Sequence, residues 1–318
     1  MGDVEQLPFP NLTPENAPPM IEPMAPTPFS RRQFLAMSAS IGFAGVVAAC
    51  GGSPSNTTQP TGTLQIVKRF PDAGLVKGKV RLPISLGDTS GVLGSESKVT
   101  LPNELHASVI DAETGDVVID KLTAKKFGEG LSVPYWPFVF TIDRESGIFL
   151  LKVEEAPESD CSFQIEKREN VLAPVMGEAL PPFDTPTTDN NRGVNPICTR
   201  TDGMCPFHDI TLTDALKSGK PVLYLIGTPA YCQTGTCTPA LDALIDAQKT
   251  LGDSVVFVHA DVYKDKTATE AAPAVKAYKL TYEPVLYITD NKGVLVERLD
   301  AVFDVKEMQA VLSAAGIS

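Results

Sequence analysis

Positive charge, long apolar runs and cysteine are all scarce in this chain of 318 residues. Its 27 Lys and Arg residues are outnumbered by 39 Asp and Glu residues, which gives a net charge of −12, and no run of basic residues occurs. We expect no nucleic-acid partner, because binding phosphates needs a clustered positive surface. No uninterrupted apolar run reaches about 18 residues, so the sequence predicts no ordinary membrane-spanning helix.

The composition nevertheless suits folded domains that contain a few disulfide bridges or reactive cysteines. Six cysteines are too few for a disulfide-scaffold protein, but they are enough for one or two bridges and a reactive site. Hydrophobic residues make up 43% of the chain, which excludes wholesale disorder, and the length suits two domains. No cofactor fingerprint occurs in the sequence, so we expect no cofactor.

Residues 1–49 are predicted to be an irregular N-terminal region followed by an export signal. Residues 1–29 are rich in Pro and acidic side chains and show no periodicity. Arg31 and Arg32 precede a Phe-Leu pair and then a weakly apolar stretch at 36–49, and this order resembles a twin-arginine export signal. The resemblance implies export of a chain that is already folded.

The export signal ends at a cysteine. The segment Val47-Ala48-Ala49-Cys50 resembles a bacterial lipobox, in which Cys50 is lipidated and becomes the mature N-terminus. Residues 50–62 are rich in Gly, Ser, Pro and Thr and are expected to form a flexible tether. The two motifs imply a protein held by its lipid on the outer face of the cytoplasmic membrane, where disulfides persist. The oligomeric state is left open.

Residues 63–169 show short alternating segments that predict a domain made of strands. A turn-forming stretch at 111–116 separates two of them. Cys161 alternates in phase with Phe163 and Ile165, so we expect it to face the core without a chemical role. The spacing favours an all-β, immunoglobulin-like sandwich. The expected strands are 64–70, 78–86, 105–110, 117–121, 137–142, 147–153 and 161–165.

Residues 170–209 form a Pro-rich joint that contains two cysteines. Because prolines break regular elements here, the segment is expected to be irregular. Cys198 and Cys205 have six residues between them and are predicted to form a structural disulfide. A metal site made of these cysteines and His208 is the alternative, but it has no evident fourth ligand, so no metal is predicted.

Residues 210–318 change to a mixed pattern of apolar strands and amphipathic helices. Helices are expected at 211–218, 239–251, 268–278 and 305–315, and strands at 221–227, 254–262, 284–289 and 294–299. This order, with a cysteine loop after the first strand and Pro284 opening a later one, resembles the thioredoxin fold. The resemblance implies an α/β domain with a central mixed sheet flanked by helices.

Cys232 and Cys237 are the predicted redox pair of this domain. They lie just before a helix whose expected N-cap is Thr238, and a helix N-terminus stabilises a thiolate. We assign Cys232 as nucleophile and Cys237 as resolving thiol, while the resemblance places Pro284 beside them. The sequence therefore predicts thiol–disulfide exchange with extracytoplasmic protein thiols or disulfides.

The pair departs from the family pattern in its spacing. Four residues separate Cys232 from Cys237, whereas two is usual in the family, so the pair must lie in a loop and no redox potential can be carried over. Three alternatives stay open: an interaction module whose Cys232–Cys237 bridge is structural, a peroxiredoxin-like peroxidase, and a copper-handling protein that would use His259.

Overall fold

The computed structural model describes residues 63–318, all of which belong to one compact unit of the chain. The predicted export signal at Arg31 and Arg32, the predicted lipidation site Cys50 and the tether lie outside the described residues. No helix in the described range is long and apolar enough to cross a membrane.

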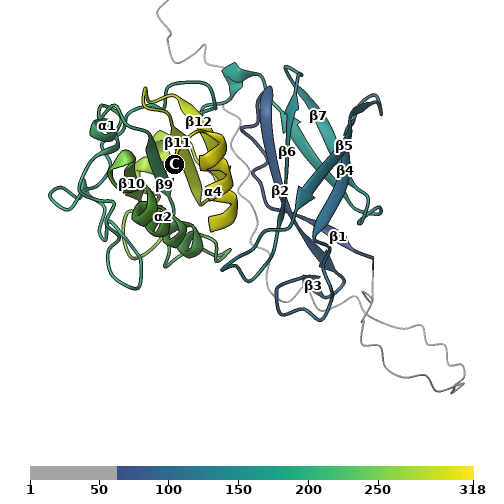
Figure 1. Cartoon of the computed structure of the whole chain (residues 1–318), viewed down its shortest axis with the longest axis horizontal. Helices are drawn as coiled ribbons and strands as arrows, with labels where there is room; N and C mark the ends of the chain where they lie inside the picture. The colour runs from purple at the N-terminus through teal and green to yellow at the C-terminus, as the bar shows by residue number, and fades with distance from the viewer. Residues whose placement is uncertain (1–62) are drawn as a thin grey trace, which may run out of the picture. The chain divides into compact units, whose positions relative to one another are not determined.

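The first part of the described chain consists of two antiparallel four-stranded sheets around one hydrophobic core (Figure 1). One sheet contains β1 (Gln65–Lys68), β2 (Gly78–Asp88), β3 (Gly91–Val92) and β6 (Trp136–Ile142). The other contains β4 (Glu104–Asp111), β5 (Val117–Lys125), β7 (Gly147–Val153) and β8 (Asp160–Ile165). The arrangement is compatible with the predicted sandwich, and its immunoglobulin-like character stays a prediction.

Strand alternation explains how these sheets bury their core. In β8 the exposed and buried residues alternate strictly, because successive side chains point to opposite faces of a sheet. Cys161, Phe163 and Ile165 form the buried face of this strand, as predicted. Burial raises the pKa of the Cys161 thiol to about 11, so this sulfur stays protonated and unreactive.

The third sheet is mixed, with the order β10-β9-β11-β12. Its strands are β9 (Val222–Ile226), β10 (Val256–Ala260), β11 (Val285–Thr289) and β12 (Leu295–Asp300). β9 and β10 are parallel, and β11 is antiparallel to both of its neighbours. Every residue of β9 and β11 is buried, as the continuous apolar runs predict for strands covered on both faces.

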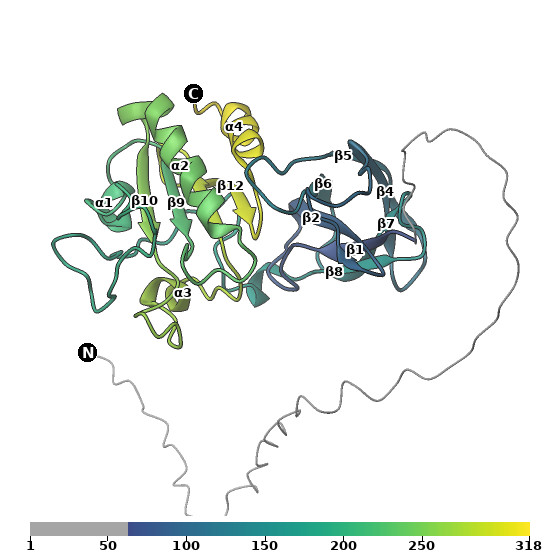
Figure 2. The ribbon, with the colours of Figure 1, turned by 90° about the horizontal axis from the view of Figure 1, so that it is seen from below.

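The two faces of this sheet are covered in different ways. On one face lie α2 (Cys237–Leu251) and α4 (Val305–Ala314), and α2 runs alongside β9 and β10 (Figure 2). The other face is covered by α1 (Leu212–Ala215), α3 (Pro273–Ala277) and irregular chain that includes Leu180. In the described part of the chain, the helices of ten or more residues therefore lie on one face of this sheet, and the helices on the other face have four and five residues.

The predicted fold class, a sandwich followed by an α/β thioredoxin-like domain flanked by helices, is wrong. The described chain is mostly β, with three four-stranded sheets and few helices. The helix expected at 268–278 shrinks to the five residues of α3, because Pro273 is its first residue and Ala272 before it is extended. The helix expected at 211–218 shrinks to α1, which stops before Gly219.

Candidate functional site

Cys232 and Cys237 lie together where β9 leads into α2. Cys232 sits in an irregular turn, and Cys237 is the first residue of α2, two positions before the expected helix start at 239; the N-cap is Thr236 and not Thr238 as expected. The Cys232 N–H donates to the Thr228 carbonyl, and Gly235 bends the chain with a φ of 67°. This bend returns the Cys237 backbone to the Cys232 sulfur, which the four-residue spacing requires.

The surroundings of the two sulfurs are unequal. Cys232 is partly exposed, and its Sγ accepts a hydrogen bond from the Cys237 backbone N–H at 3.4 Å. The Thr234 Oγ1 lies 3.3 Å from the same sulfur. Cys237 is fully buried. One sulfur is thus open to a partner and surrounded by donors, while the other is enclosed.

These contacts set the charge of the pair. The pKa of Cys232 is lowered to about 4, chiefly because the Cys237 thiol donates a hydrogen bond to its sulfur, with Thr234 and backbone N–H groups adding to the effect. The pKa of Cys237 is raised, because its proton is held in that hydrogen bond and its sulfur is buried. At neutral pH the reduced pair therefore consists of one thiolate and one thiol.

Pro284 and Glu283 complete this site from the start of β11. The Glu283–Pro284 peptide bond is cis. Pro284 Cβ lies 3.5 Å, and Cys237 Sγ 3.7 Å, from the position that a Cβ on Gly227 would take, so both border the same glycine. The carboxylate of Glu283 lies within 4.8 Å of both sulfurs. Burial, and next the charge of Cys232, raise the pKa of Glu283.

Sequence reasoning missed Glu283 as a functional residue. Nothing in a single sequence places an acidic side chain next to a cysteine pair that lies about fifty residues earlier. The available signal was the position itself, beside a proline that the resemblance already put next to the cysteines.

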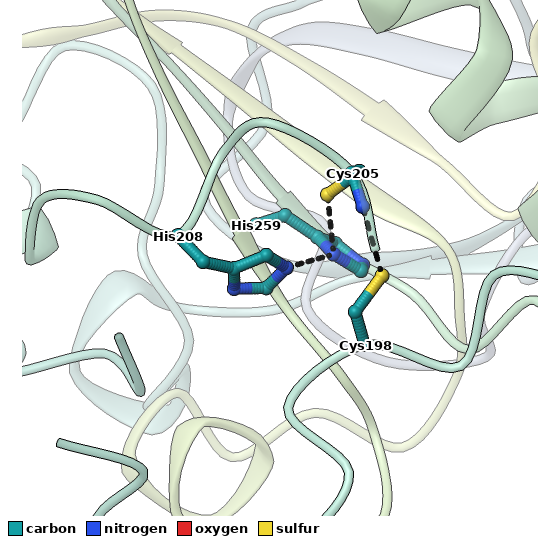
Figure 3. A group of neighbouring side chains, drawn as sticks. All are labelled: Cys198, Cys205, His208 and His259. Carbon is teal, nitrogen blue, oxygen red and sulfur yellow. Dashed lines mark hydrogen bonds between the residues drawn. The ribbon is translucent and has the colours of Figure 1, made fainter. Parts of the chain in front are cut away.

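A second sulfur cluster consists of Cys198, Cys205, His208 and His259 (Figure 3). Its four potential ligand atoms all lie within 4.8 Å of one another. His259 Nδ1 is 3.2 Å from His208 Nε2 and 3.4 Å from Cys205 Sγ. Cys198 and Cys205 are free thiols in the structure. The disulfide that the sequence predicts between them stays a prediction. The fourth residue, His259, comes from β10 and was not linked to this group by the sequence.

The two cysteines of this cluster also differ in charge. The pKa of Cys198 is lowered, first because Cys205 donates a hydrogen bond to its sulfur, and then because both histidines contact it. The pKa of Cys205 is raised by the same hydrogen bond and by burial. The cluster therefore stabilises a thiolate at Cys198 in a buried position.

The two sulfur clusters share a backbone segment. Gly227 borders Cys237, as described above, and its carbonyl oxygen is 3.1 Å from His259 Nε2. Thr199, next to Cys198, donates to the Asp261 carboxylate at 2.6 Å and accepts from the Ala230 N–H at 3.3 Å. The chain between β9 and the redox pair is thus contacted by His259 of the second cluster at Gly227 and by Thr199, the neighbour of Cys198, at Ala230.

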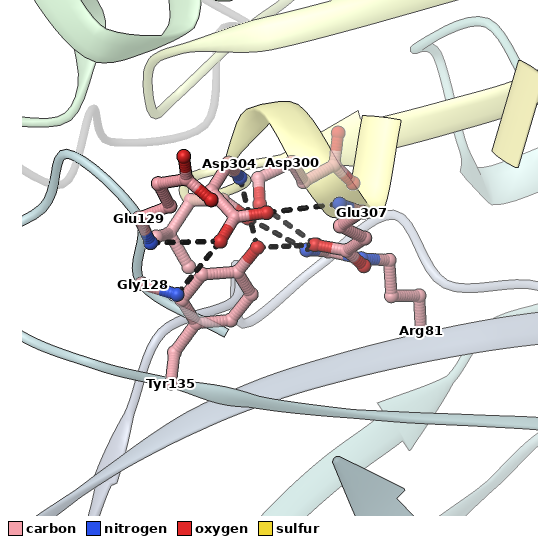
Figure 4. A network of polar contacts seen from close by, with 8 residues as sticks. Arg81, Gly128, Glu129, Tyr135, Asp300, Asp304 and Glu307 are labelled. Carbon is pink, nitrogen blue, oxygen red and sulfur yellow. Dashed lines mark hydrogen bonds and ion pairs between the residues drawn. The ribbon is translucent and has the colours of Figure 1, made fainter. Parts of the chain in front are cut away.

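A third polar group, around Arg81 of β2, has its partners within the protein (Figure 4). The Arg81 guanidinium donates to both carboxylate oxygens of Glu307, each at 2.7 Å. Tyr135 donates to Glu307 at 2.6 Å, and Asp304 accepts from the Gly128 and Glu129 N–H groups. Because these groups satisfy one another's hydrogen bonds, the network links β2, the 128–129 loop and α4 structurally.

Comparison with known proteins gives no relative from which to transfer a function, since no family model matches the chain and no curated protein matches it.

Proposed function

We propose that this protein is a membrane-anchored, extracytoplasmic thiol–disulfide oxidoreductase that acts through Cys232 and Cys237. The unequal pair supports the proposal most strongly. A partly exposed sulfur with a pKa of about 4 is a competent nucleophile, and a buried thiol within hydrogen-bond reach can resolve the product.

The reaction uses each residue in turn. The Cys232 thiolate attacks one sulfur of a substrate disulfide, the substrate S–S bond breaks, and the departing thiolate takes a proton from water. Cys237 then gives its proton to Glu283, attacks the Cys232 sulfur and displaces the second substrate thiolate, which takes up the proton held by Glu283. The substrate gains two electrons and two protons, while the cysteine pair becomes a disulfide. The reverse sequence oxidises substrate thiols.

A trapping experiment tests this order. In the full chain, Cys237→Ser should accumulate mixed disulfides with envelope proteins through Cys232, whereas Cys232→Ser should accumulate none. Cys161→Ala, which removes a buried and unrelated sulfur, is the matched control. Trapping that requires Cys237 and not Cys232 would reverse the assigned roles.

Reduction under native conditions separates this function from its alternatives. The proposal expects the pair to equilibrate with a glutathione series in the folded protein. A pair that reduces only in denaturant contradicts it and leaves a structural bridge in an interaction module. Rapid peroxide consumption without exchange on protein substrates would instead favour the peroxidase.

The proposal also includes the cellular location of the protein. It rests on the sequence motifs at Arg31, Arg32 and Cys50, and its partners are protein thiols or disulfides outside the cytoplasm. Replacing both arginines by lysine should retain the chain in the cytoplasm. Cys50→Ala should abolish labelling by a fatty-acid probe and release the exported protein from membranes, which fractionation would detect.

A further inference from the structure

The cluster of Cys198, Cys205, His208 and His259 has the donor set of a tetrahedral metal centre. Two thiol sulfurs and two imidazole nitrogens form the combination that zinc takes in structural sites. All four side chains are buried, with exposed fractions of 9% for Cys198 and 3% or less for the others. Hard cations such as Mg²⁺ and Ca²⁺ are excluded by chemistry, because they bind oxygen ligands.

The spacing of the donors fits one central ion. With zinc–nitrogen bonds of about 2.05 Å and zinc–sulfur bonds of about 2.3 Å, tetrahedral geometry puts two nitrogens about 3.3 Å apart and nitrogen and sulfur about 3.6 Å apart. The nitrogens of His208 and His259 are separated by 3.2 Å, and the Cys205 sulfur is 3.4 Å from His259 Nδ1. Both separations match edges of that tetrahedron within a few tenths of an ångström.

Supporting hydrogen bonds aim the donors inward. The Nε2–H of His259 can donate to the Gly227 carbonyl at 3.1 Å, which leaves the Nδ1 lone pair directed at the other three residues. The Cys205 N–H donates to the Cys198 sulfur at 3.5 Å and so supports a thiolate there. Among the described residues, His208 Nδ1 has no hydrogen-bond partner, so the ring makes its polar contacts through Nε2, on the cluster side.

We infer that these four residues form a closed structural Zn²⁺ site. Binding deprotonates both thiols, forms two Zn–S and two Zn–N bonds and releases two protons. Two thiolates and one Zn²⁺ sum to zero charge, which suits a buried position. Because the protein fills all four positions, the ion has no open position for substrate and acts by holding the 198–208 segment against β10 and Gly227.

Metal analysis of the full chain, purified without chelator, tests the inference. We expect one zinc per chain, and His208→Ala or His259→Ala should weaken zinc binding by more than the roughly 100-fold that loss of a mere supporting partner costs. His106→Ala removes the remaining histidine, an exposed residue paired with Glu155, and should keep the zinc. Cys232→Ser should also keep it, which separates this site from the redox pair.

A second measurement does not depend on variants that fold. Unmodified chain reconstituted with Co²⁺ should show the visible bands of tetrahedral cobalt together with thiolate charge transfer. Non-reducing peptide mapping that finds a Cys198–Cys205 disulfide in a chain without metal overturns the inference. So does stoichiometric copper or iron in place of zinc, or zinc that is lost in Cys232→Ser and kept in His208→Ala.

Discussion

At the residue scale, the chemistry of the redox pair depends on a single shared proton. The Cys237 thiol is the largest influence on the pKa of Cys232, and the same hydrogen bond raises the pKa of Cys237. Glu283 faces both sulfurs and is the nearby group that can accept this proton when Cys237 must attack. Nucleophile and resolving thiol are therefore activated at different stages of one reaction.

The first prediction concerns the ionisation of Cys232. Because its pKa lies at about 4, alkylation of the reduced protein by iodoacetamide should stay fast from alkaline pH down to mildly acidic pH and fall only as pH drops through about 4. Cys237→Ala removes the main donor and should raise the pKa of Cys232 by about 1 to 2. An alkylation profile with an ordinary thiol midpoint of about 8.5 would contradict the assignment.

The second prediction concerns Glu283. Glu283→Gln keeps the shape of the side chain and removes the proton acceptor, so resolution of the mixed disulfide should slow on the order of 100-fold while the first attack is unchanged. In the unmodified protein the resolution rate should fall as pH decreases through the raised pKa of Glu283, because the protonated carboxyl cannot accept a proton. Rapid-quench measurement of mixed-disulfide decay checks both statements. Equal decay in the variant would remove Glu283 from the mechanism.

At the element scale, α4 is anchored by buried charge at its N-terminus. Asp304 caps the helix by accepting from the Glu307 N–H at 2.9 Å, and it also accepts from two N–H groups of the 128–129 loop. Glu307 in turn holds Arg81, and the two side chains are only 5% and 10% exposed. The helix is thus held in register with β2 by directional contacts as well as by apolar packing.

The third prediction follows from that ion pair. Arg81→Ala leaves the Glu307 carboxylate buried without its partner and should lower the free energy of unfolding by about 3 to 5 kcal/mol. Lys249→Ala breaks an exposed ion pair with Asp246 and should cost less than about 1 kcal/mol. Urea unfolding followed by circular dichroism provides both values. Equal losses in the two variants would show that the buried network contributes no special stability.

Elements with strong local signals were predictable from the sequence, and their packing was not. The apolar runs at β9 and β11 and the Cys-loop before α2 follow from residues that are neighbours in the chain. The covering of the second face of the mixed sheet does not follow from local sequence, because it combines Leu180, α1 and α3 from distant segments. His259 joins Cys198 for the same reason: a strand end meets a loop some sixty residues earlier, and no spacing rule encodes that meeting.

At the scale of the whole molecule, residues of the two antiparallel sheets and of the mixed sheet belong to one compact unit. The contact between Arg81 of β2 and Glu307 of α4 spans more than two hundred residues of sequence. A boundary drawn from composition near residue 170 therefore does not by itself establish independent folding.

The fourth prediction tests this cooperativity. Trp136 is the only tryptophan and is fully buried in β6, so its fluorescence reports on the antiparallel sheets. Cys237 is buried at the start of α2, so its labelling in the reduced Cys232→Ser chain reports on the mixed sheet. Both signals should change at the same urea concentration. Two separate midpoints would show that the parts unfold independently.

The burial of the four cluster residues has a consequence for the timing of metal capture. A solvent-exposed ion exchanges readily with its surroundings, but an ion enclosed by Cys198, Cys205, His208 and His259 could leave only when the chain opens around it. The metal would then be selected once, during folding, by whichever compartment the chain folded in. If the chain is exported after folding, as the proposed function includes, the bound ion would be one taken up in the cytoplasm.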